Sequence, residues 1–213
     1  MSSTSLRFLI TAGPTQEFLD PIRYVSNRSS GRMGFAIAEA ALAVSSNVTL
    51  VSGPTCLTAP KGVEFVPVTA AQEMAEAVWS RFGSADICIM AAAVCDFRPK
   101  TTAGSKIKKG SFSGRLELEP TPDILAELGR RKKSQVLVGF AAETDDMEKH
   151  AREKLARKGL DFIVANDTSA FDAETNRVAI LSGDGTVEKL PELPKIEVAK
   201  AIVERAVRLL CRP

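Results

Sequence analysis

The chain has 213 residues, enough to bury a sizeable core as one large domain or as one domain with a small appendage. Its 28 Lys and Arg residues and 26 Asp and Glu residues nearly balance, so the composition argues against nucleic acid or an anionic membrane as a partner. Four widely spaced cysteines, with no CxxC pair and no histidine cluster, indicate a reduced, cytoplasmic protein without structural zinc. The apolar run near the N-terminus is too short for a signal peptide, and none along the chain is long enough for a membrane span.

In chain order, short apolar runs alternate with amphipathic helical segments. The expected strands are residues 6–11, 48–52, 64–68, 86–93, 136–141, 162–166 and 177–182. The expected helices are residues 32–45, 70–82, a segment opening at the PDIL of 122–125, 147–158 and 196–210. Such alternation predicts one α/β domain over residues 1–213, a doubly wound, Rossmann-like, mostly parallel sheet with helices on both faces.

A polar stretch rich in Gly and Ser interrupts this alternation and predicts a mobile flap, with some β structure, at about residues 99–119. At its centre, SKIKKG places Lys106 and Lys108 on one face of an extended backbone and Ile107 on the other. A basic flap with glycine hinges can close over a triphosphate through charge-assisted hydrogen bonds. An ordinary solvated loop is the alternative.

Polar or glycine-rich segments directly follow the expected strands: TAGPT, SGPT, AAAVCDFRP, GFAAET and VANDTS. In a doubly wound sheet, ligands bind outside the carboxyl ends of the strands and at helix N-termini. Any one of these segments is explained by the backbone geometry of a turn. Five of them at one edge favour a large polar ligand there.

YVSNRSSGRMG, residues 24–34, opens the first helix and has the glycines and serines of a phosphate-binding turn. It is not a dinucleotide fingerprint, because it does not directly follow the first strand and SGPT after the second offers no acidic residue for a ribose. Neither a Walker loop nor a GxSxG elbow occurs, and the single histidine, His150, falls in a charged helix where we expect it to be solvated. We therefore expect a site that positions reactants and neutralises phosphate charge.

Six segments, in this order, resemble the phosphopantothenoylcysteine synthetase family, the ligase half of coenzyme A biosynthesis enzymes that are often fused to a decarboxylase. They are ITAGPTQEFLDPIRYVSNRSSGRMGFAIAEAAL, AAAVCDFRP, SKIKKG, TPDIL, GFAAET and VANDTS. The resemblance covers nearly the whole chain, and the decarboxylase half is not in it, so the chain resembles a free-standing synthetase with a separate decarboxylase as an expected partner. Cys95, Phe97 and Thr121 depart from the family's usual alanine, tyrosine and asparagine.

The resemblance implies a reaction and its components. The carboxylate of 4′-phosphopantothenate is activated by CTP with Mg²⁺, giving an acyl-cytidylate and pyrophosphate, and the amine of L-cysteine then forms the amide and releases CMP. Members of the family are homodimers whose site borrows residues from the neighbouring subunit. An ATP-using version of the same ligase is the alternative for the nucleotide.

The resemblance also implies roles for individual residues, with the metal ligands left unassigned. Asn27 and Lys106 are the expected catalytic residues: Asn27 holds the acyl-nucleotide, and Lys106 meets the nucleotide phosphates. The expected nucleotide contacts are Met90, Ala91, Ala92, Asp96, Lys106, Pro122, Asp123, Ile124, Leu125, Phe140, Lys154 and Lys158. The expected phosphopantothenate contacts are Arg23, Asn27, Ser29, Ser30, Gly31 and Ala93.

Physically, the neutral Asn27 amide can donate to a carbonyl oxygen that becomes negative during amine attack. The competing interpretation is that Asn27 only caps the turn before the helix. Two rival classes remain: a dinucleotide-dependent oxidoreductase, disfavoured by the missing ribose acid, and a binding-only subunit, disfavoured by the presence of both Asn27 and Lys106.

Overall fold

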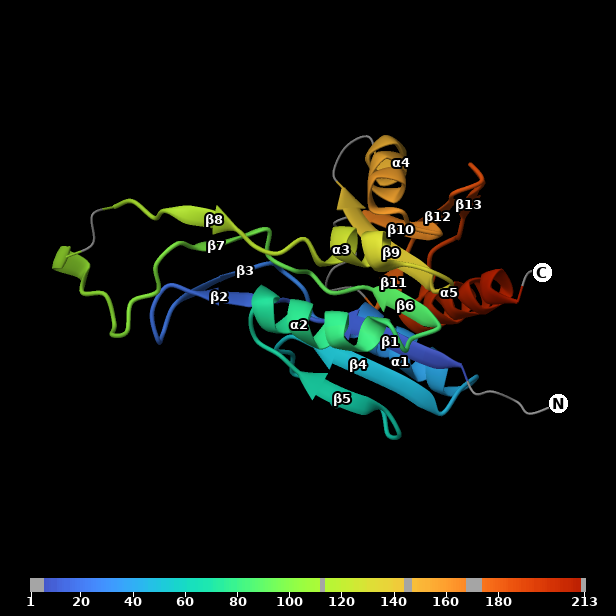
Figure 1. Cartoon of the computed structure of the whole chain (residues 1–213), viewed down its shortest axis with the longest axis horizontal. Helices are drawn as coiled ribbons and strands as arrows, with labels where there is room; N and C mark the ends of the chain where they lie inside the picture. Colours follow the sequence, from blue (N-terminus) through green and yellow to red (C-terminus); the bar gives the residue numbers. More distant parts are fainter. Residues whose placement is uncertain (1–5, 112–113, 144–146, 168–173, 212–213) are drawn as a thin grey trace.

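The computed structural model describes residues 6–111, 114–143, 147–167 and 174–211 (Figure 1). Within these ranges, eight strands form a central sheet in the order β13-β12-β10-β9-β6-β1-β4-β5. They are β1 (Arg7–Ala12), β4 (Asn47–Ser52), β5 (Glu64–Pro67), β6 (Ile87–Met90), β9 (Val136–Glu143), β10 (Phe162–Asp167), β12 (Val178–Ser182) and β13 (Val187–Lys189). The strands from β10 to β5 pair in parallel, and β12 and β13 pair antiparallel. The predicted doubly wound, mostly parallel sheet is confirmed.

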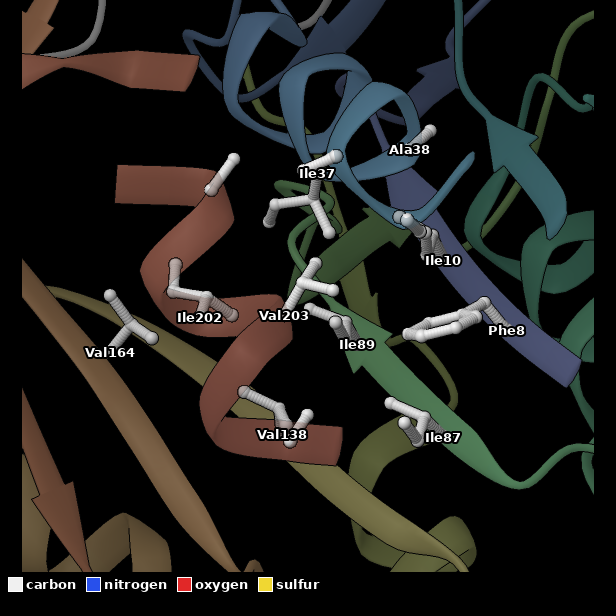
Figure 2. Close-up of a cluster of buried hydrophobic side chains, with 14 of the residues drawn as sticks. Phe8, Ile10, Ile37, Ala38, Ile87, Ile89, Val138, Val164, Ile202 and Val203 are labelled. Atoms are coloured by element: carbon white, nitrogen blue, oxygen red, sulfur yellow. The ribbon is translucent and has the colours of Figure 1, made fainter. Parts of the chain in front are cut away.

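Helices cover both faces of this sheet. They are α1 (Arg32–Leu42), α2 (Ala71–Phe82), α3 (Ile124–Arg131), α4 (Met147–Lys158) and α5 (Lys195–Leu210), with a short 3-10 turn, η1, at Lys109–Ser111. On one face, Phe8 and Ile10 of β1 meet Ile37 of α1 and Val203 of α5 (Figure 2). On the other face, Leu9 belongs to a second buried cluster shared with α2, α3 and α4. Because both faces are covered, the inner strands such as β1 and β6 are continuous apolar runs rather than alternating ones.

One strand and one helix end three residues earlier than predicted. The strand expected at 86–93 ends at Met90, since Ala93 leaves the sheet and exchanges backbone hydrogen bonds with the loop after β1, at Gly13 and Thr15. The helix expected at 32–45 ends at Leu42, and Ser45 turns back to donate its hydroxyl to the carbonyl of Leu6.

An arm extends from the carboxyl edge of the sheet (Figure 1). It consists of the β2 (Gln16–Phe18) and β3 (Tyr24–Ser26) hairpin, and of the β7 (Phe97–Pro99) and β8 (Leu118–Pro120) hairpin with the described residues between them. Residues 112 and 113 of the predicted flap lie outside the described residues. The flap does have β structure, as expected, but it is tied to the first hairpin: Ala103 donates to the Leu19 carbonyl at 2.9 Å and Thr102 to that of Phe18 at 3.0 Å.

Neither the β2–β3 hairpin of the arm nor a further two-stranded ribbon near the C-terminus was predicted from the sequence. Strands β11 (Thr175–Asn176) and β14 (Leu193–Pro194) pair antiparallel immediately before α5. Strands of two or three residues are too short to show a period in the sequence, so pattern reading does not detect them.

Candidate functional site

The phosphate-type turn before α1 is held by close backbone packing. Gly31 is the N-cap of α1 with φ +77°, a left-handed conformation that favours glycine. A Cβ on Gly31 would lie 2.7 Å from the Thr55 methyl, and one on Gly34 would lie 2.5 Å from the Cβ of Ala12. Only glycine at these two positions lets α1 begin directly against the end of β1.

The turns TAGPT and SGPT, which were expected to hold a ligand, instead pack against each other next to the turn before α1. A Cβ on Gly53 would lie 1.7 Å from the Pro14 carbonyl oxygen, and one on Gly13 would lie 2.9 Å from the Gly53 carbonyl oxygen. The glycines of TAGPT and SGPT are therefore explained by packing of one turn on the other. Neither turn lines the two cavities described next.

Two neighbouring cavities lie at the carboxyl edge of the sheet. Cavity A has a volume of about 470 Å³ and lies at the N-terminus of α1. Cavity B, of about 700 Å³, lies between β6, α3 and α4. They share Ala92, Val94, Asp96, Phe140 and Lys154 as a common wall. Ligands bound in the two cavities would therefore lie next to each other, in contact with the same five residues.

The charges around cavity A favour an anion. Arg28, Arg32, Lys154 and Lys195 line it, against the single carboxylate of Asp96. Helix α1 points its N-terminus at the cavity, with no side-chain cap and no acidic residue in its first turn. Backbone N–H groups and the helix dipole at such an end attract a phosphate or carboxylate.

Asn27 lies on the wall of cavity A and is not the helix cap. Its Nδ2 donates to the Val94 carbonyl at 2.9 Å, whereas the N-cap position belongs to Gly31. The interpretation of Asn27 as a cap of α1 is therefore wrong. A primary amide has two N–H donors, so the bond to Val94 orients the side chain and leaves a second donor for a ligand.

Cavity B is organised by two lysines one helical turn apart on α4. Lys154 donates to the Phe140 carbonyl at 2.8 Å, and Lys158 forms a salt bridge with Asp123. Asp123 is also the N-cap of α3, where it accepts from the Ala126 amide at 3.0 Å. Burial opposes its ionisation, but the Lys158 and Ala126 hydrogen bonds outweigh burial and hold the pKa of Asp123 below its usual value.

The three departures from the family pattern all line cavity B: Cys95, Phe97 and Thr121. Thr121 donates its hydroxyl to the Cys95 carbonyl at 2.5 Å and its amide to the Asp96 carbonyl at 3.0 Å, which fixes the segment between them. Cys95 is buried, and this burial raises the pKa of its thiol, which disfavours the thiolate form that a nucleophile needs.

The expected site residues separate between the two cavities. Cavity A is lined by Asn27, Ser29, Ser30, Gly31, Ala91, Ala92, Ala93, Asp96, Phe140 and Lys154. Cavity B is lined by Met90, Ala92, Asp96, Pro122, Asp123, Ile124, Leu125, Phe140, Lys154 and Lys158. Most of the expected phosphopantothenate contacts therefore lie in cavity A and most of the expected nucleotide contacts in cavity B.

Arg23 and Lys106 line neither cavity and lie on the arm. Asp20 is fully buried at the base of this arm and accepts from Arg23 Nε at 2.9 Å and from the Ile107 amide at 3.1 Å. Arg23 also donates to the Ile107 carbonyl at 2.7 Å, which fixes the flap beside the hairpin. Lys106 and Lys108 are exposed on either side of Ile107, as the alternation predicts.

Several cavity residues were not anticipated. They are Arg28, Arg32, Asn166, Asn176 and Lys195 in cavity A, and His150, Glu153 and Arg157 in cavity B. His150 is exposed, as expected, but at the cavity rim. Thr144, Thr168 and Ser169, at the ends of GFAAET and VANDTS, lie outside the described residues.

The carboxylates of the cavities fit a metal that arrives with a ligand. Across the part of the chain that the structure describes, no three His, Cys, Asp or Glu residues group closely enough to form a metal site. Mg²⁺ is commonly held by one or two carboxylates together with substrate phosphates. Asp96, on the common wall, is suitably placed for that role.

Among the described residues, no helix has the length and apolar character needed to cross a membrane.

Comparison with known proteins identifies close relatives of this arrangement. The chain matches the DNA/pantothenate metabolism flavoprotein C-terminal domain over residues 4–210. It is 50% identical over 206 residues to the coenzyme A biosynthesis bifunctional protein CoaBC of Bacillus subtilis (strain 168), covering 94% of this chain and 51% of that protein. The chain thus spans about half the length of this relative.

Two solved structures share the fold. The C-terminal domain of a coenzyme A biosynthesis bifunctional protein CoaBC is 45% identical, with a TM-score of 0.85 over 96% of this chain and 95% of that one. The Cab2 mutant H337A, solved in complex with phosphopantothenate-cysteine, is 18% identical, with a TM-score of 0.80 over 96% of this chain and 87% of that one. At that identity the second likeness supports the fold alone.

Proposed function

The chain belongs to the DNA/pantothenate metabolism flavoprotein C-terminal domain family, and we propose that it is a phosphopantothenoylcysteine synthetase. In this proposal it joins L-cysteine to 4′-phosphopantothenate through an acyl-cytidylate, consuming CTP and releasing CMP and pyrophosphate. The observation that carries the proposal is the pair of cavities with a common wall, one with an anion-binding helix end and Asn27, the other with Lys154 and Lys158. Two substrates that must react with each other need such neighbouring compartments.

The first half-reaction joins the contents of the two cavities. A carboxylate oxygen of phosphopantothenate in cavity A attacks the α-phosphorus of CTP in cavity B. The bond from that phosphorus to the bridging oxygen breaks, and pyrophosphate leaves with the electron pair. Lys154 lies on the wall where these groups meet, and its charge offsets the repulsion between the two anions.

In the second half-reaction the cysteine amine attacks the acyl carbon, and its proton is lost as CMP departs and the amide forms. The carbonyl oxygen becomes negative during this attack. The second N–H of Asn27 is the donor we assign to that oxygen, because the hydrogen bond of the first N–H to the Val94 carbonyl fixes the direction of the side chain.

In the first half-reaction, Mg²⁺ would be held by the triphosphate and Asp96, and it would offset the charge on the departing phosphates.

We also propose that the protein works as a homodimer, since Arg23 and Lys106 lie on the arm rather than in the cavities of their own chain. The arm presents large apolar side chains to solvent: Ile22, Tyr24, Phe97, Leu116 and Leu118 are each more than 40% exposed. Exposed apolar groups gathered on one projecting segment are typical of a protein contact. In the dimer, Arg23 and Lys106 would complete the site of the other copy.

The reaction is tested by incubating the protein with phosphopantothenate, cysteine, Mg²⁺ and either CTP or ATP, and following pyrophosphate and amide product together. We expect both to appear with CTP. Faster turnover with ATP would replace CTP as the nucleotide and leave the ligase standing. Pyrophosphate that never depends on phosphopantothenate would exclude the ligase.

The shared site is tested by mixing two variants that are each impaired in amide formation, Asn27→Asp and Lys106→Ala. If each site combines Asn27 of one copy with Lys106 of the other, a mixed dimer has one intact site. Random exchange at equal concentrations should then restore about one quarter of the wild-type sites. Recovery that stays at the level of the separate variants would show that both residues serve the same chain's site.

The substrates are intermediates of central metabolism, so we place the reaction in the cytoplasm. Phosphopantothenoylcysteine is the substrate of a decarboxylase, and a separate decarboxylase is the expected partner of this activity.

A further inference from the structure

Asp96 lies on the common wall of cavities A and B, in the segment that connects two strands. Strand β6 ends at Met90, and β7 begins at Phe97, directly after Asp96. The ladder of the central sheet therefore does not reach Asp96, although its carboxylate is the one that both cavities share. Contacts from other parts of the chain must set the position of this segment.

Two threonine hydroxyls hold the backbone of Cys95, the residue before Asp96. The Cys95 amide donates to Thr15 Oγ1 at 2.9 Å, and the Cys95 carbonyl accepts from Thr121 Oγ1 at 2.5 Å. Cys95 is 3% exposed and Thr15 is fully buried. A buried backbone group that loses its partner is strongly unfavourable, so the two hydroxyls confine Cys95 from both sides.

Each threonine connects this segment to one of the two cavities. The Thr15 carbonyl accepts from Ser26 Oγ at 2.7 Å, and Ser26 directly precedes Asn27 of cavity A. On the other side, Thr121 lines cavity B shortly before α3, and its amide donates to the Asp96 carbonyl at 3.0 Å. The threonines therefore fix Asp96 relative to the side chains of both cavities.

We propose that Thr15 and Thr121 are positioning residues, which hold the Cys95 peptide so that the Asp96 carboxylate is placed as a ligand for the Mg²⁺ that accompanies the triphosphate. Neither threonine contacts the reacting atoms in this role. The inference rests on the proposed synthetase function, in which Asp96 binds that metal. Residues that orient a metal ligand without touching the metal commonly contribute about tenfold to a hundredfold in metal affinity.

The test measures CTP binding to the full chain by calorimetry, with Mg²⁺ and without it. Thr121→Ser and Thr121→Ala both lack the threonine methyl group and differ in the hydroxyl, so their comparison isolates the hydrogen bond to Cys95. With Mg²⁺ present, Thr121→Ala should weaken CTP binding about tenfold to a hundredfold. Without Mg²⁺ its affinity should change little, and Thr121→Ser should stay close to wild type in both conditions.

A double-mutant cycle shows whether Thr121 acts through Asp96. Asp96→Asn removes the charge that binds the metal, so it should weaken Mg²⁺-dependent CTP binding at least as much as Thr121→Ala does. The double variant should bind no more weakly than Asp96→Asn alone, because positioning has no effect once the ligand charge is gone. Losses that add in the double variant would mean that Thr121 contacts the nucleotide independently, and they would overturn the positioning role.

Ser45→Ala is the matched structural control. It removes another hydroxyl that donates to a backbone carbonyl at 2.5 Å, that of Leu6, at the opposite edge of the sheet. This variant should have a lower melting temperature and unchanged CTP affinity with Mg²⁺. If Thr121→Ala does not fold, Thr15→Ser and Thr15→Ala are compared in the same way, and Thr15→Ala should show the same Mg²⁺-dependent loss because the Cys95 amide loses its acceptor.

The remaining outcomes separate this inference from the proposed function. An unchanged Mg²⁺-dependent affinity for CTP in the folded alanine variant would overturn the inference and leave the synthetase function standing. An equal loss of affinity with and without Mg²⁺ would also overturn it, since that result indicates a general disruption of cavity B. A wild-type protein that binds no CTP even with Mg²⁺ would contradict the synthetase function itself.

Discussion

Replacing Asn27 with Asp separates the two half-reactions. The substitution keeps the size of the side chain but removes the amide that donates to the Val94 carbonyl at 2.9 Å. In its place a carboxylate faces that carbonyl and the position assigned to the developing oxyanion. Activation of the substrate carboxylate does not use this donor, whereas amine attack does, so the second half-reaction should suffer more.

The expected magnitudes differ enough to be distinguished. Asn27 is exposed, so loss of its neutral hydrogen bond should cost about 0.5–1.5 kcal/mol of unfolding free energy, and a few degrees in melting temperature. Loss of a donor to an oxyanion costs about a hundredfold to a thousandfold in rate. Amide formation should fall by that factor in a protein that is folded at the assay temperature.

Rapid-quench measurements provide the assay. With phosphopantothenate and CTP, the variant should release pyrophosphate and accumulate the acyl-cytidylate, visible by mass spectrometry, with almost no amide after cysteine is added. Asn27→Ala is the matched control, because it removes the donor without adding charge and should be less impaired. Pyrophosphate and amide falling by the same factor, with no intermediate, would refute the assigned role.

Three further substitutions test the arm and the turn. Lys106→Ala should slow pyrophosphate release about tenfold to a hundredfold, since one charge-assisted contact to the triphosphate is lost, and an unchanged rate would mean that this lysine is only solvated. Gly31→Ala forces alanine into φ +77° at about 1–2 kcal/mol and places its Cβ 2.7 Å from the Thr55 methyl, so urea unfolding should show a loss that Thr55→Ser partly restores. Hydrogen bonds from Arg23 hold the pKa of Asp20 well below its usual value, so its stabilisation is present above about pH 4 and is lost as pH falls through the folded pKa. The difference in unfolding free energy between wild type and Asp20→Asn should therefore be constant near neutral pH and shrink in acid; a difference that persists unchanged into strong acid would contradict this account.

Local sequence determined the layers of this protein and the position of its principal turn. Short continuous apolar runs that end in turn residues are typical of strands covered on both faces, and the helical period of the residues after Gly31 indicates a helix that starts there. Because parallel strands end at the same edge, the carboxyl ends of β6, β9 and β10 were bound to meet. Asp96 after β6, Phe140 in β9 and Asn166 in β10 do line one cavity.

Tertiary structure decided what each of these segments does. From its sequence context, Gly53 is predicted to bind a ligand. In the structure it packs against the Pro14 carbonyl, a residue far from it in the chain, and this contact explains the glycine. Likewise, β2, β3, β7 and β8 are too short to show a period, so only their pairing reveals the arm that carries Lys106 away from the cavities. Lys195 has the pattern of an ordinary first residue of a helix, and it becomes a cavity residue because α5 packs beside α1 and both begin at the same place. Local sequence patterns predict which residues are buried. The role of a buried polar residue depends on its contacts with residues that are distant in the chain, and only the tertiary structure brings these together.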